Sequence, residues 1–317
     1  MARIIVTHGV PQSGLEMLDG HEVFYPGELK VFSQDELMQM AGNADAVIAG
    51  GLLDAAFIDA AVNLKIIANY GAGFDRVDVK AASAHKIPVT NTPDETSEPT
   101  AEIAIGLILA TARRIAELDH RLRNEPTPTL FGMGKHMGMG LKGNTLGIVG
   151  MGRIGSFVAE FGKLMGMRVV YYNRHRAADE HGAEWVTLEE LMRSSQIVSV
   201  HCPLNDSTRY LIGEKELSYM QERAILVNTA RGPVVDYEAL AHRLAEGQLL
   251  AAGLDVFDHE PEIPEILLEL PNVVLTPHIG TNTREAREAM LRACCSRILE
   301  VLKGERPQHV VNPEIYE

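Results

Sequence analysis

Three segments in the second half of the chain place polar and charged residues shortly after an apolar run that has the composition of a buried strand: Val227–Gly232, Gly253–Pro261 and Leu275–Gly280. The carboxyl ends of parallel strands meet at one edge of a sheet, which is where ligands of open α/β folds bind. Arginine can hold a carboxylate, histidine exchanges protons near neutral pH, and a nearby carboxylate favours the protonated imidazole. Each residue alone could be an ordinary loop residue. Residues of these types at one sheet edge are the types that anion binding and proton transfer require.

A glycine-rich turn, Gly150-Met151-Gly152-Arg153-Ile154-Gly155, lies between an apolar run and a helical pattern. The first glycine permits a tight turn, the second lets the backbone approach a pyrophosphate, and the third lets the helix pack against the strand. The unpaired N–H groups at the start of the helix attract phosphate. A glycine pattern alone is weak evidence, but strand, turn and helix in this order predict a dinucleotide site. The expected contacts are Gly150, Gly152, Arg153, Ile154 and Gly155.

The end of the next apolar run, Arg168–Tyr172, indicates which dinucleotide binds. An NAD enzyme usually has Asp or Glu there, about 20 residues after the turn, to bind the ribose hydroxyls. This chain instead continues with Asn173, Arg174, His175 and Arg176. The arginines can bind a 2′-phosphate in a fork, and the neutral asparagine does not repel it. We predict that NADP(H) is preferred and that NAD(H) is also accepted. The alternative is that Arg174 and Arg176 only cover the surface.

Alternating apolar runs and helical segments predict two α/β units with parallel sheets. Residues 3–7, 45–49 and 64–68 read as strands of the first unit, with room for helices between them. Six further runs in one series fit a complete dinucleotide-binding domain. These runs are Thr145–Val149, Arg168–Tyr172, Ile197–Val200, Ala224–Asn228, Leu250–Leu254 and Val273–Thr276.

Two long helices and one irregular segment complete the expected organisation. A helix is predicted to start after Pro99, and its part Ile103–Ala112 is apolar almost all round, which is typical of a helix in an interface or in a core. An amphipathic helix over Arg284–Lys303 would return the chain to the first unit. The segment Asn124–Leu141 is rich in Pro, Gly and Met, above all at Gly132–Gly140, and predicts an irregular connection.

Composition limits the class of protein. A chain of 317 residues exceeds what one core usually supports, so we expect a substrate domain of residues 1–98 with 288–317 and a dinucleotide domain of residues 99–287. The formal net charge of −14 argues against a nucleic-acid-binding or lipid-bound protein. We see neither a signal-peptide pattern nor an apolar stretch long enough for a membrane span. No metal site is expected, and we expect reduced thiols in the cytoplasm at Cys202, Cys294 and Cys295.

Five segments in one order resemble a known family, the D-isomer-specific 2-hydroxyacid dehydrogenases, in their glyoxylate/hydroxypyruvate reductase-like branch. They are the loop Asn69–Asp75, the glycine turn, Arg231, Glu260 and His278, and the resemblance extends over nearly the whole chain. It implies two doubly wound parallel-sheet α/β domains, a Rossmann cofactor domain and a flavodoxin-like substrate domain, with the active site in the cleft between them. It also implies NAD(P)-dependent reduction of a small 2-keto acid to the D-2-hydroxy acid, and a homodimer.

The resemblance assigns a role to each residue of the trio. Arg231 would hold the carboxylate and the carbonyl of the keto acid and stabilise the oxyanion that hydride transfer creates. His278 would supply the proton that must reach this oxygen, with Glu260 favouring its charged form. The neighbouring His259 is given no role, because the family motif uses the acid at this place. Other histidines expected to be structural are His8, His136, His175 and His201.

Further contacts follow from the same resemblance. Backbone N–H groups of Gly71, Ala72 and Gly73 would bind the substrate carboxylate, and Leu52 would face the substrate's side chain. Asp255 would orient the nicotinamide carboxamide. The remaining expected cofactor contacts are Cys202, Pro203, Thr229, Ala230 and Gly280.

The sequence leaves the substrate and two rival functions open. No arginine lies near Gly50–Leu53, which disfavours a phosphorylated acid, so glyoxylate, hydroxypyruvate and arylpyruvates remain candidates. A formate dehydrogenase-like enzyme is one rival, although that branch is expected to lack an acid at Glu260. A dinucleotide-sensing, co-repressor-like binding protein is the other. The segment Gly132–Gly140 departs from the family pattern.

Overall fold

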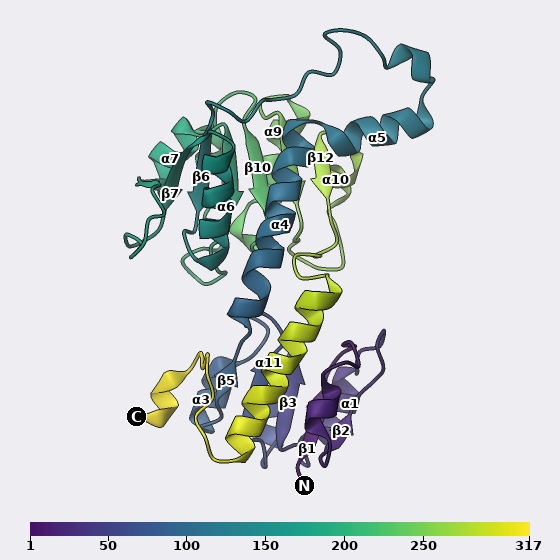
Figure 1. Cartoon of the computed structure of the whole chain (residues 1–317), viewed down its shortest axis with the longest axis vertical. Coiled ribbons are helices and arrows are strands. Elements are labelled where there is room, and N and C mark those ends of the chain that lie inside the picture. Colours follow the sequence, from purple (N-terminus) through teal and green to yellow (C-terminus); the bar gives the residue numbers. More distant parts are fainter. The chain divides into compact units, whose positions relative to one another are not determined.

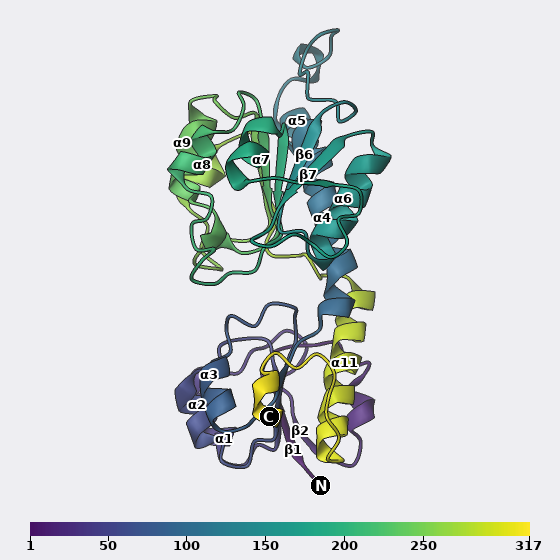
Figure 2. The same cartoon turned by 90° about the vertical axis from the view of Figure 1, so that its left-hand side faces the viewer.

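The computed structural model describes all 317 residues, and the chain divides into two compact units. Unit 1 comprises residues 1–99 and 281–317, and unit 2 comprises residues 100–280 (Figures 1 and 2). The chain returns from unit 2 to unit 1 after residue 280. The expected boundary near residue 287 differs from this, because it falls inside helix α11 (Arg284–Leu302). The helix is a single packed element whose buried residues lie against the unit 1 sheet, so the division falls before it.

Unit 1 is a five-stranded parallel sheet in the order β2-β1-β3-β4-β5, which is the flavodoxin-like order. Side chains alternate between its faces, so Ile5, Val47 and Ile67 pack on one side with α1 to α3, while Ile4 and Ile48 pack on the other with α11. Figure 2 shows α1 to α3 on the opposite side of this sheet from α11. The strands are β1 (Arg3–Val6), β2 (Glu22–Phe24), β3 (Ala46–Ala49), β4 (Ile66–Asn69) and β5 (Val89–Thr90). The helices of this layer are α1 (Gln34–Ala41), α2 (Ala55–Ala60) and α3 (Val79–Ala84).

Unit 2 is a seven-stranded parallel sheet in the order β12-β11-β10-β9-β6-β7-β8, with helices on both faces. This is the dinucleotide-binding order, and the direction of strand addition reverses between β6 and β9. The strands are β6 (Thr145–Val149), β7 (Arg168–Tyr172), β8 (Glu184–Trp185), β9 (Ile197–Val200), β10 (Ile225–Asn228), β11 (Ala251–Leu254) and β12 (Val273–Leu275). The shorter helices are α6 (Arg153–Leu164), α7 (Leu188–Ser194), α8 (Glu214–Ser218), α9 (Tyr237–Ala245) and α10 (Glu265–Glu269).

The predicted fold class is confirmed: both sheets are parallel, and every predicted strand is present. The three strands that the sequence analysis missed, β2, β5 and β8, all lie at sheet edges. These three strands have only two or three residues each. Their apolar patterns are therefore too short to recognise in a sequence.

Helix α4 runs from Pro93 to Ala112, so the predicted start after Pro99 is wrong. A proline inside a helix removes one N–H donor but does not have to end the helix when packing compensates. Here the hydroxyls of Thr96 and Ser97 donate to carbonyls of the preceding turn. The apolar part of the helix packs into the unit 2 core, where Ile108 is fully buried. None of the helices combines the length and the hydropathy that a membrane span requires.

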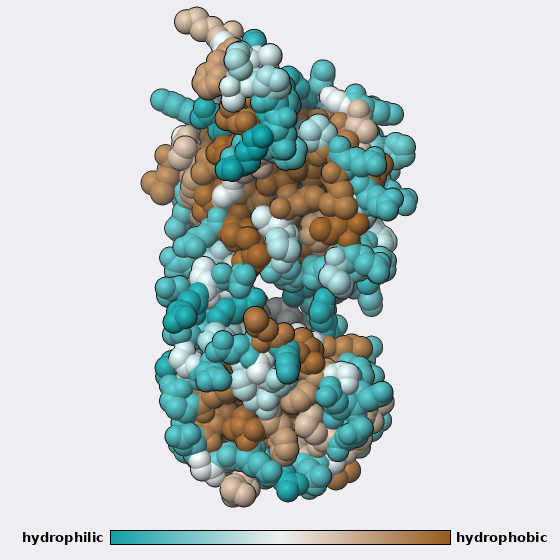
Figure 3. Space-filling view, turned by 90° about the vertical axis from the view of Figure 1, so that its right-hand side faces the viewer, coloured by the Kyte–Doolittle hydropathy of each residue, from teal (hydrophilic) through white to brown (hydrophobic).

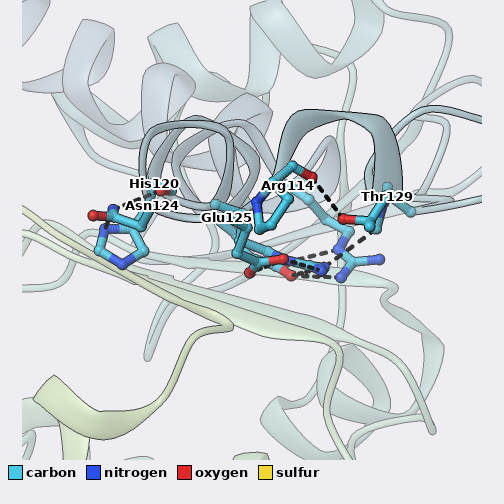
Figure 4. Close-up of polar contacts among 9 residues, drawn as sticks. Arg114, His120, Asn124, Glu125 and Thr129 are labelled. Carbon is cyan, nitrogen blue, oxygen red and sulfur yellow. Dashed lines mark hydrogen bonds and ion pairs between the residues drawn. The ribbon is translucent and has the colours of Figure 1, made fainter.

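Residues 113–140, which we call the arm, project from the rest of unit 2 (Figure 1). The arm contains α5 (Ile115–Asn124), a 3₁₀ helix (Thr127–Thr129) and then irregular chain, as the glycine-rich composition predicted. Ion pairs between residues three or four apart reinforce α5, with Arg114 on Glu117 and Arg121 on Glu125 (Figure 4). The C-terminal end of the arm is held against the end of α4 by a hydrogen bond, in which the Met139 N–H donates to the carbonyl oxygen of Ala112 (2.7 Å).

Candidate active site

The structure brings Glu260 and His278 together at the carboxyl edge of the unit 2 sheet. Nδ1 of His278 lies 2.9 and 3.0 Å from the two carboxylate oxygens of Glu260. A carboxylate can only accept, so Nδ1 carries the proton of this bond and Nε2 is the nitrogen that exchanges a proton. Nε2 has no partner, and 45% of the His278 side chain is exposed against 19% for Glu260. The pair therefore presents one free ring nitrogen, backed by a partly buried negative charge.

The backbone of His278 is in the left-handed region, with φ 52°, which is uncommon for a residue other than glycine. Asp255 holds this loop in place. Its carbonyl oxygen accepts the His278 N–H at 2.8 Å, and its carboxylate accepts the hydroxyl of Thr276 and the N–H groups of Ile279 and Gly280. Burial raises the pKa of the Asp255 carboxyl group.

Asp255 is 1% exposed, and both carboxylate oxygens already accept hydrogen bonds from the loop of His278. In the structure its side chain thus positions the catalytic candidate. The predicted contact with the nicotinamide carboxamide stays a prediction.

Arg231 lies on the loop after β10, half-buried, with an extended backbone and one guanidinium nitrogen donating to the Ala230 carbonyl oxygen at 2.7 Å. This loop packs against the loop that leads to Glu260. A Cβ on Gly232 would lie 2.2 Å from the carbonyl carbon of Phe257, so only glycine permits this contact. The arginine loop and the Glu260 loop are thus neighbours, as the sheet-edge prediction required.

Two buried polar residues that the sequence analysis did not single out support the arginine loop. The Asn228 side chain accepts the N–H of Ala230 and donates to the Arg231 carbonyl oxygen and to the Tyr237 hydroxyl. That hydroxyl in turn donates to the carbonyl oxygen of Val256, next to Asp255. The signal available in the sequence was an asparagine at the end of an otherwise apolar strand.

The glycine turn has the conformation that a dinucleotide requires. Gly150 has φ 104°, and a Cβ there would lie 2.5 Å from the backbone nitrogen of Cys202, on the loop after β9. A Cβ on Gly155 would lie 2.3 Å from the carbonyl oxygen of Gly150. Space at Gly152 is open, and α6 begins there without a side-chain cap, so the positive end of the helix faces a space that a phosphate can approach.

Side chains at the end of β7 have different partners. The Asn173 amide accepts the N–H of Met151 at 2.8 Å and donates to its carbonyl oxygen at 3.1 Å, so it braces the glycine turn. Arg176 forms a two-pronged ion pair with Glu180. Arg174 is exposed and forms no hydrogen bond or ion pair, so it is the arginine that can reach a phosphate without losing a partner.

Four of the remaining predicted cofactor contacts lie on the loops after β9 and β10, and the fifth, Gly280, follows β12. Burial raises the pKa of the Cys202 thiol to about 11, so it is a neutral thiol at physiological pH. His201, next to it, bonds the hydroxyls of Ser199 and Thr229, and burial lowers its pKa to about 3. It is therefore neutral and structural, as predicted. The others on these loops are Pro203 and Ala230.

Four predicted substrate contacts belong to unit 1, on the loops after β3 and β4. Leu52 is 52% exposed, and no cation lies in its own loop from Gly50 to Leu53. The N–H groups of Ala72 and Gly73 have no acceptor, whereas the Gly71 N–H bonds the Asn69 carbonyl oxygen.

The other histidines have structural surroundings or lie on the surface. The ring of His8 packs against the tilted ring of Tyr70, and burial lowers the pKa of His8 to about 4. A Cβ on Gly50 would overlap this ring, so glycine is required there. His175 and His259 are exposed, and His136 lies in the arm.

Comparison with known proteins places these residues in a family. Residues 105–280 match the family model for the NAD binding domain of D-isomer specific 2-hydroxyacid dehydrogenases. A glyoxylate reductase of Thermococcus litoralis is 41% identical over 330 residues, which cover 99% of this chain and 97% of the relative. A glyoxylate reductase of Aeropyrum pernix is 42% identical over 328 residues, covering 99% and 96%.

Solved structures agree with this. A protein of Thermus thermophilus superposes with a TM-score of 0.90 at 39% identity, covering 98% of this chain and 99% of the other. An NADPH-dependent glyoxylate/hydroxypyruvate reductase of Sinorhizobium meliloti, solved with NADP and malonate, superposes with a TM-score of 0.86 at 31% identity, covering 98% and 96%.

Proposed function

The chain belongs to the D-isomer-specific 2-hydroxyacid dehydrogenase family, and on this premise we propose that it reduces a small 2-keto acid to the D-2-hydroxy acid with a nicotinamide dinucleotide. The observation that carries the proposal is the Glu260–His278 pair, whose free Nε2 lies at the same sheet edge as Arg231. Glyoxylate, hydroxypyruvate and arylpyruvates are the proposed substrate class, and the relatives named for glyoxylate reduction favour the first two.

We assign a separate role in the reaction to each of Arg231, His278 and Glu260. The Arg231 guanidinium binds the carboxylate and the keto oxygen of the substrate and stabilises negative charge on that oxygen. His278 gives its Nε2 proton to the same oxygen, and Glu260 stabilises the imidazolium beforehand. When bound, the reduced nicotinamide supplies the hydride. Oxidation of the hydroxy acid uses the same groups in reverse, with neutral Nε2 as the base.

The chain's own geometry fits a dinucleotide. The left-handed Gly150, the open space at Gly152 and the start of α6 without a side-chain cap together let a pyrophosphate approach the backbone at the positive end of the helix. We propose Gly150, Gly152, Arg153, Ile154 and Gly155 as the residues that hold it.

The rival functions are less well supported. Formate oxidation releases no proton that a paired acid would have to handle, so the Glu260–His278 pair has no use in a formate dehydrogenase. A dinucleotide-sensing binding protein would show no turnover. Loss of NADPH absorbance with glyoxylate, hydroxypyruvate and phenylpyruvate tests the proposal, and absence of turnover with this whole panel would refute it.

We further propose that NADP(H) is preferred and that Arg174 selects it. Replacing Arg174 with alanine should raise the KM for NADPH about 10- to 100-fold, because a charge-assisted bond to the 2′-phosphate is lost, and should leave the KM for NADH within about twofold. Arg176→Ala should have a smaller effect, because Glu180 already occupies that guanidinium. Steady-state kinetics with both cofactors checks this.

Arg168→Ala is the matched control, since Arg168 is an exposed arginine at the other end of the same strand. Equal or better kcat/KM with NADH in the unaltered enzyme would contradict the preference.

We also propose that the enzyme acts as a homodimer in the cytoplasm, with the second copy covering an apolar face of unit 2. The edge strand β12 leaves Val274 half-exposed beside a depression of about 270 Å³ that Ala110 and Met137 also line. Figure 3 shows apolar residues gathered on a face of this unit. The arm exposes Phe131 (72%) and Met133 fully. Unpaired edge strands and apolar patches of this kind are typical of contact surfaces.

A dimer predicts that light scattering gives twice the chain mass of 34.7 kDa. Changing both Phe131 and Met133 to glutamate should shift the protein towards monomer, because two charges would have to be buried. Exchanging the exposed Leu164 for glutamate, at the end of α6, is the control that should leave the mass unchanged. A monomeric unaltered protein would contradict the proposal.

A further inference from the structure

In the loop after β4, the carbonyl groups of residues 71–74 are occupied, whereas three successive amide groups are free. The carbonyl oxygens of Gly71, Ala72, Gly73 and Phe74 each accept at least one hydrogen bond. The N–H groups of Ala72, Gly73 and Phe74 have no acceptor. Consecutive free N–H groups form an anion-binding concavity, provided that the carbonyl dipoles point away from it.

Side-chain amides supply most of the donors that hold these carbonyl groups. Nδ2 of the buried Asn69 donates to the carbonyl oxygens of Gly71 and Gly73, both at 2.9 Å. Nδ2 of Asn91 donates to the carbonyl oxygen of Ala72 at 2.8 Å. The two asparagines therefore hold three successive carbonyl groups on one side of the loop.

Both asparagines are themselves held by the fold of unit 1. The Asn91 carbonyl oxygen accepts a hydrogen bond from the buried guanidinium of Arg297 on α11, and its N–H donates to the carbonyl oxygen of His309. The Asn69 carbonyl oxygen accepts the thiol of Cys294, also on α11. Helix α11 thus fixes the backbone from which each amide reaches the loop.

We propose that Asn69 and Asn91 are positioning residues: they keep the carbonyl groups of the loop turned inward so that its N–H groups bind the substrate's carboxylate. The proposal rests on the proposed reduction of 2-keto acids and adds residues that do not touch the substrate. A carboxylate at either position would fit the space but would meet carbonyl oxygens without a proton to donate. The carbonyl groups would turn away, and the N–H groups would turn with them.

The test compares Asn69→Asp with a control of the same chemistry. Asn312 is a buried asparagine of unit 1 whose Nδ2 also donates to a backbone carbonyl oxygen, that of Ile87, away from this loop. Asn69→Asp should raise the KM for glyoxylate about 10- to 100-fold, because several hydrogen bonds to a charged group are misplaced. The kcat at saturation should change far less, and Asn312→Asp should change neither.

Two further readouts separate positioning from loss of folding. NADPH affinity should be unchanged in Asn69→Asp, measured from the fluorescence of Trp185, the only tryptophan, whose indole N–H bonds the Asn173 carbonyl oxygen in unit 2. Oxamate is an unreactive analogue of a 2-keto acid. Its Kd, measured by calorimetry, should rise in Asn69→Asp by the same factor as the KM for glyoxylate. If Asn69→Asp does not fold, Asn91→Asp gives the test. The expected rise in the KM for glyoxylate is then smaller, because one hydrogen bond to the loop is lost instead of two.

The outcomes distinguish this inference from the function on which it rests. No turnover by the unaltered enzyme with any 2-keto acid would refute the function. Normal turnover by the unaltered enzyme, with the KM and the oxamate affinity unchanged in the asparagine variants, would overturn the inference alone. An equal rise in KM in Asn312→Asp would also overturn it, because the effect would then be a general consequence of destabilising unit 1.

Discussion

His278→Ala should lower the kcat for keto-acid reduction by about 10²- to 10⁴-fold, the usual contribution of a positioned general acid. The reason is that Nε2 is the free nitrogen of a ring whose other nitrogen is held by Glu260. The side chain touches no part of the glycine turn, so NADPH affinity measured from Trp185 fluorescence should be unchanged. Stopped-flow or steady-state loss of NADPH absorbance gives the rate.

His259→Ala is the matched control, because His259 is an exposed histidine next to Glu260 that the proposal leaves without a role. It should retain nearly full activity. Reduction of the keto acid takes up one proton and oxidation of the hydroxy acid releases one, so a rise in pH should disfavour reduction and favour oxidation in the unaltered enzyme. Near-full activity in His278→Ala, or an equal loss in His259→Ala, would show that the proton comes from elsewhere.

Arg231→Ala should lower kcat/KM for the keto acid by about 10²- to 10³-fold, with the loss divided between KM and kcat. KM rises because the arginine holds the substrate's carboxylate, and kcat falls because it also stabilises charge that grows on the keto oxygen. Arg231→Lys should recover little of this, since an ammonium group cannot make the two parallel bonds of a guanidinium fork. Kinetics at saturating NADPH measures both parameters.

Arg193→Ala is the control for this variant. Arg193 is a partly exposed arginine of the same unit, paired with Glu189 on the surface of α7. A rise in KM with an unchanged kcat in Arg231→Ala would assign the arginine to binding alone. Unchanged values of both would remove it from the site.

Structural elements that depend on neighbouring residues could be predicted from the sequence, whereas elements that depend on long-range packing could not. The central strands β6, β9 and β10 have four or five residues each, all of them buried and most of them apolar, and such a pattern involves only a few neighbours, so it is visible in a short window of the chain. The edge strand β8 is two exposed residues long, and Pro99 lies inside a helix that tertiary packing stabilises. Neither can be recognised locally.

The sequence by itself determined the fold class, the glycine turn and the residue types that could bind an anion and move a proton, because these depend on spacing along the chain and on side-chain chemistry. Only the tertiary structure decided what each polar atom meets. It directs Nδ1 of His278 to Glu260, Asn173 to the glycine turn, and Arg176 to Glu180, which leaves Arg174 free. It also places Asn69 beneath the loop whose amide groups it orients. A hydrogen bond requires its two atoms within about 3 Å, and for the His278–Glu260 and Asn173–Met151 pairs that distance is set by how separate strands and loops pack together.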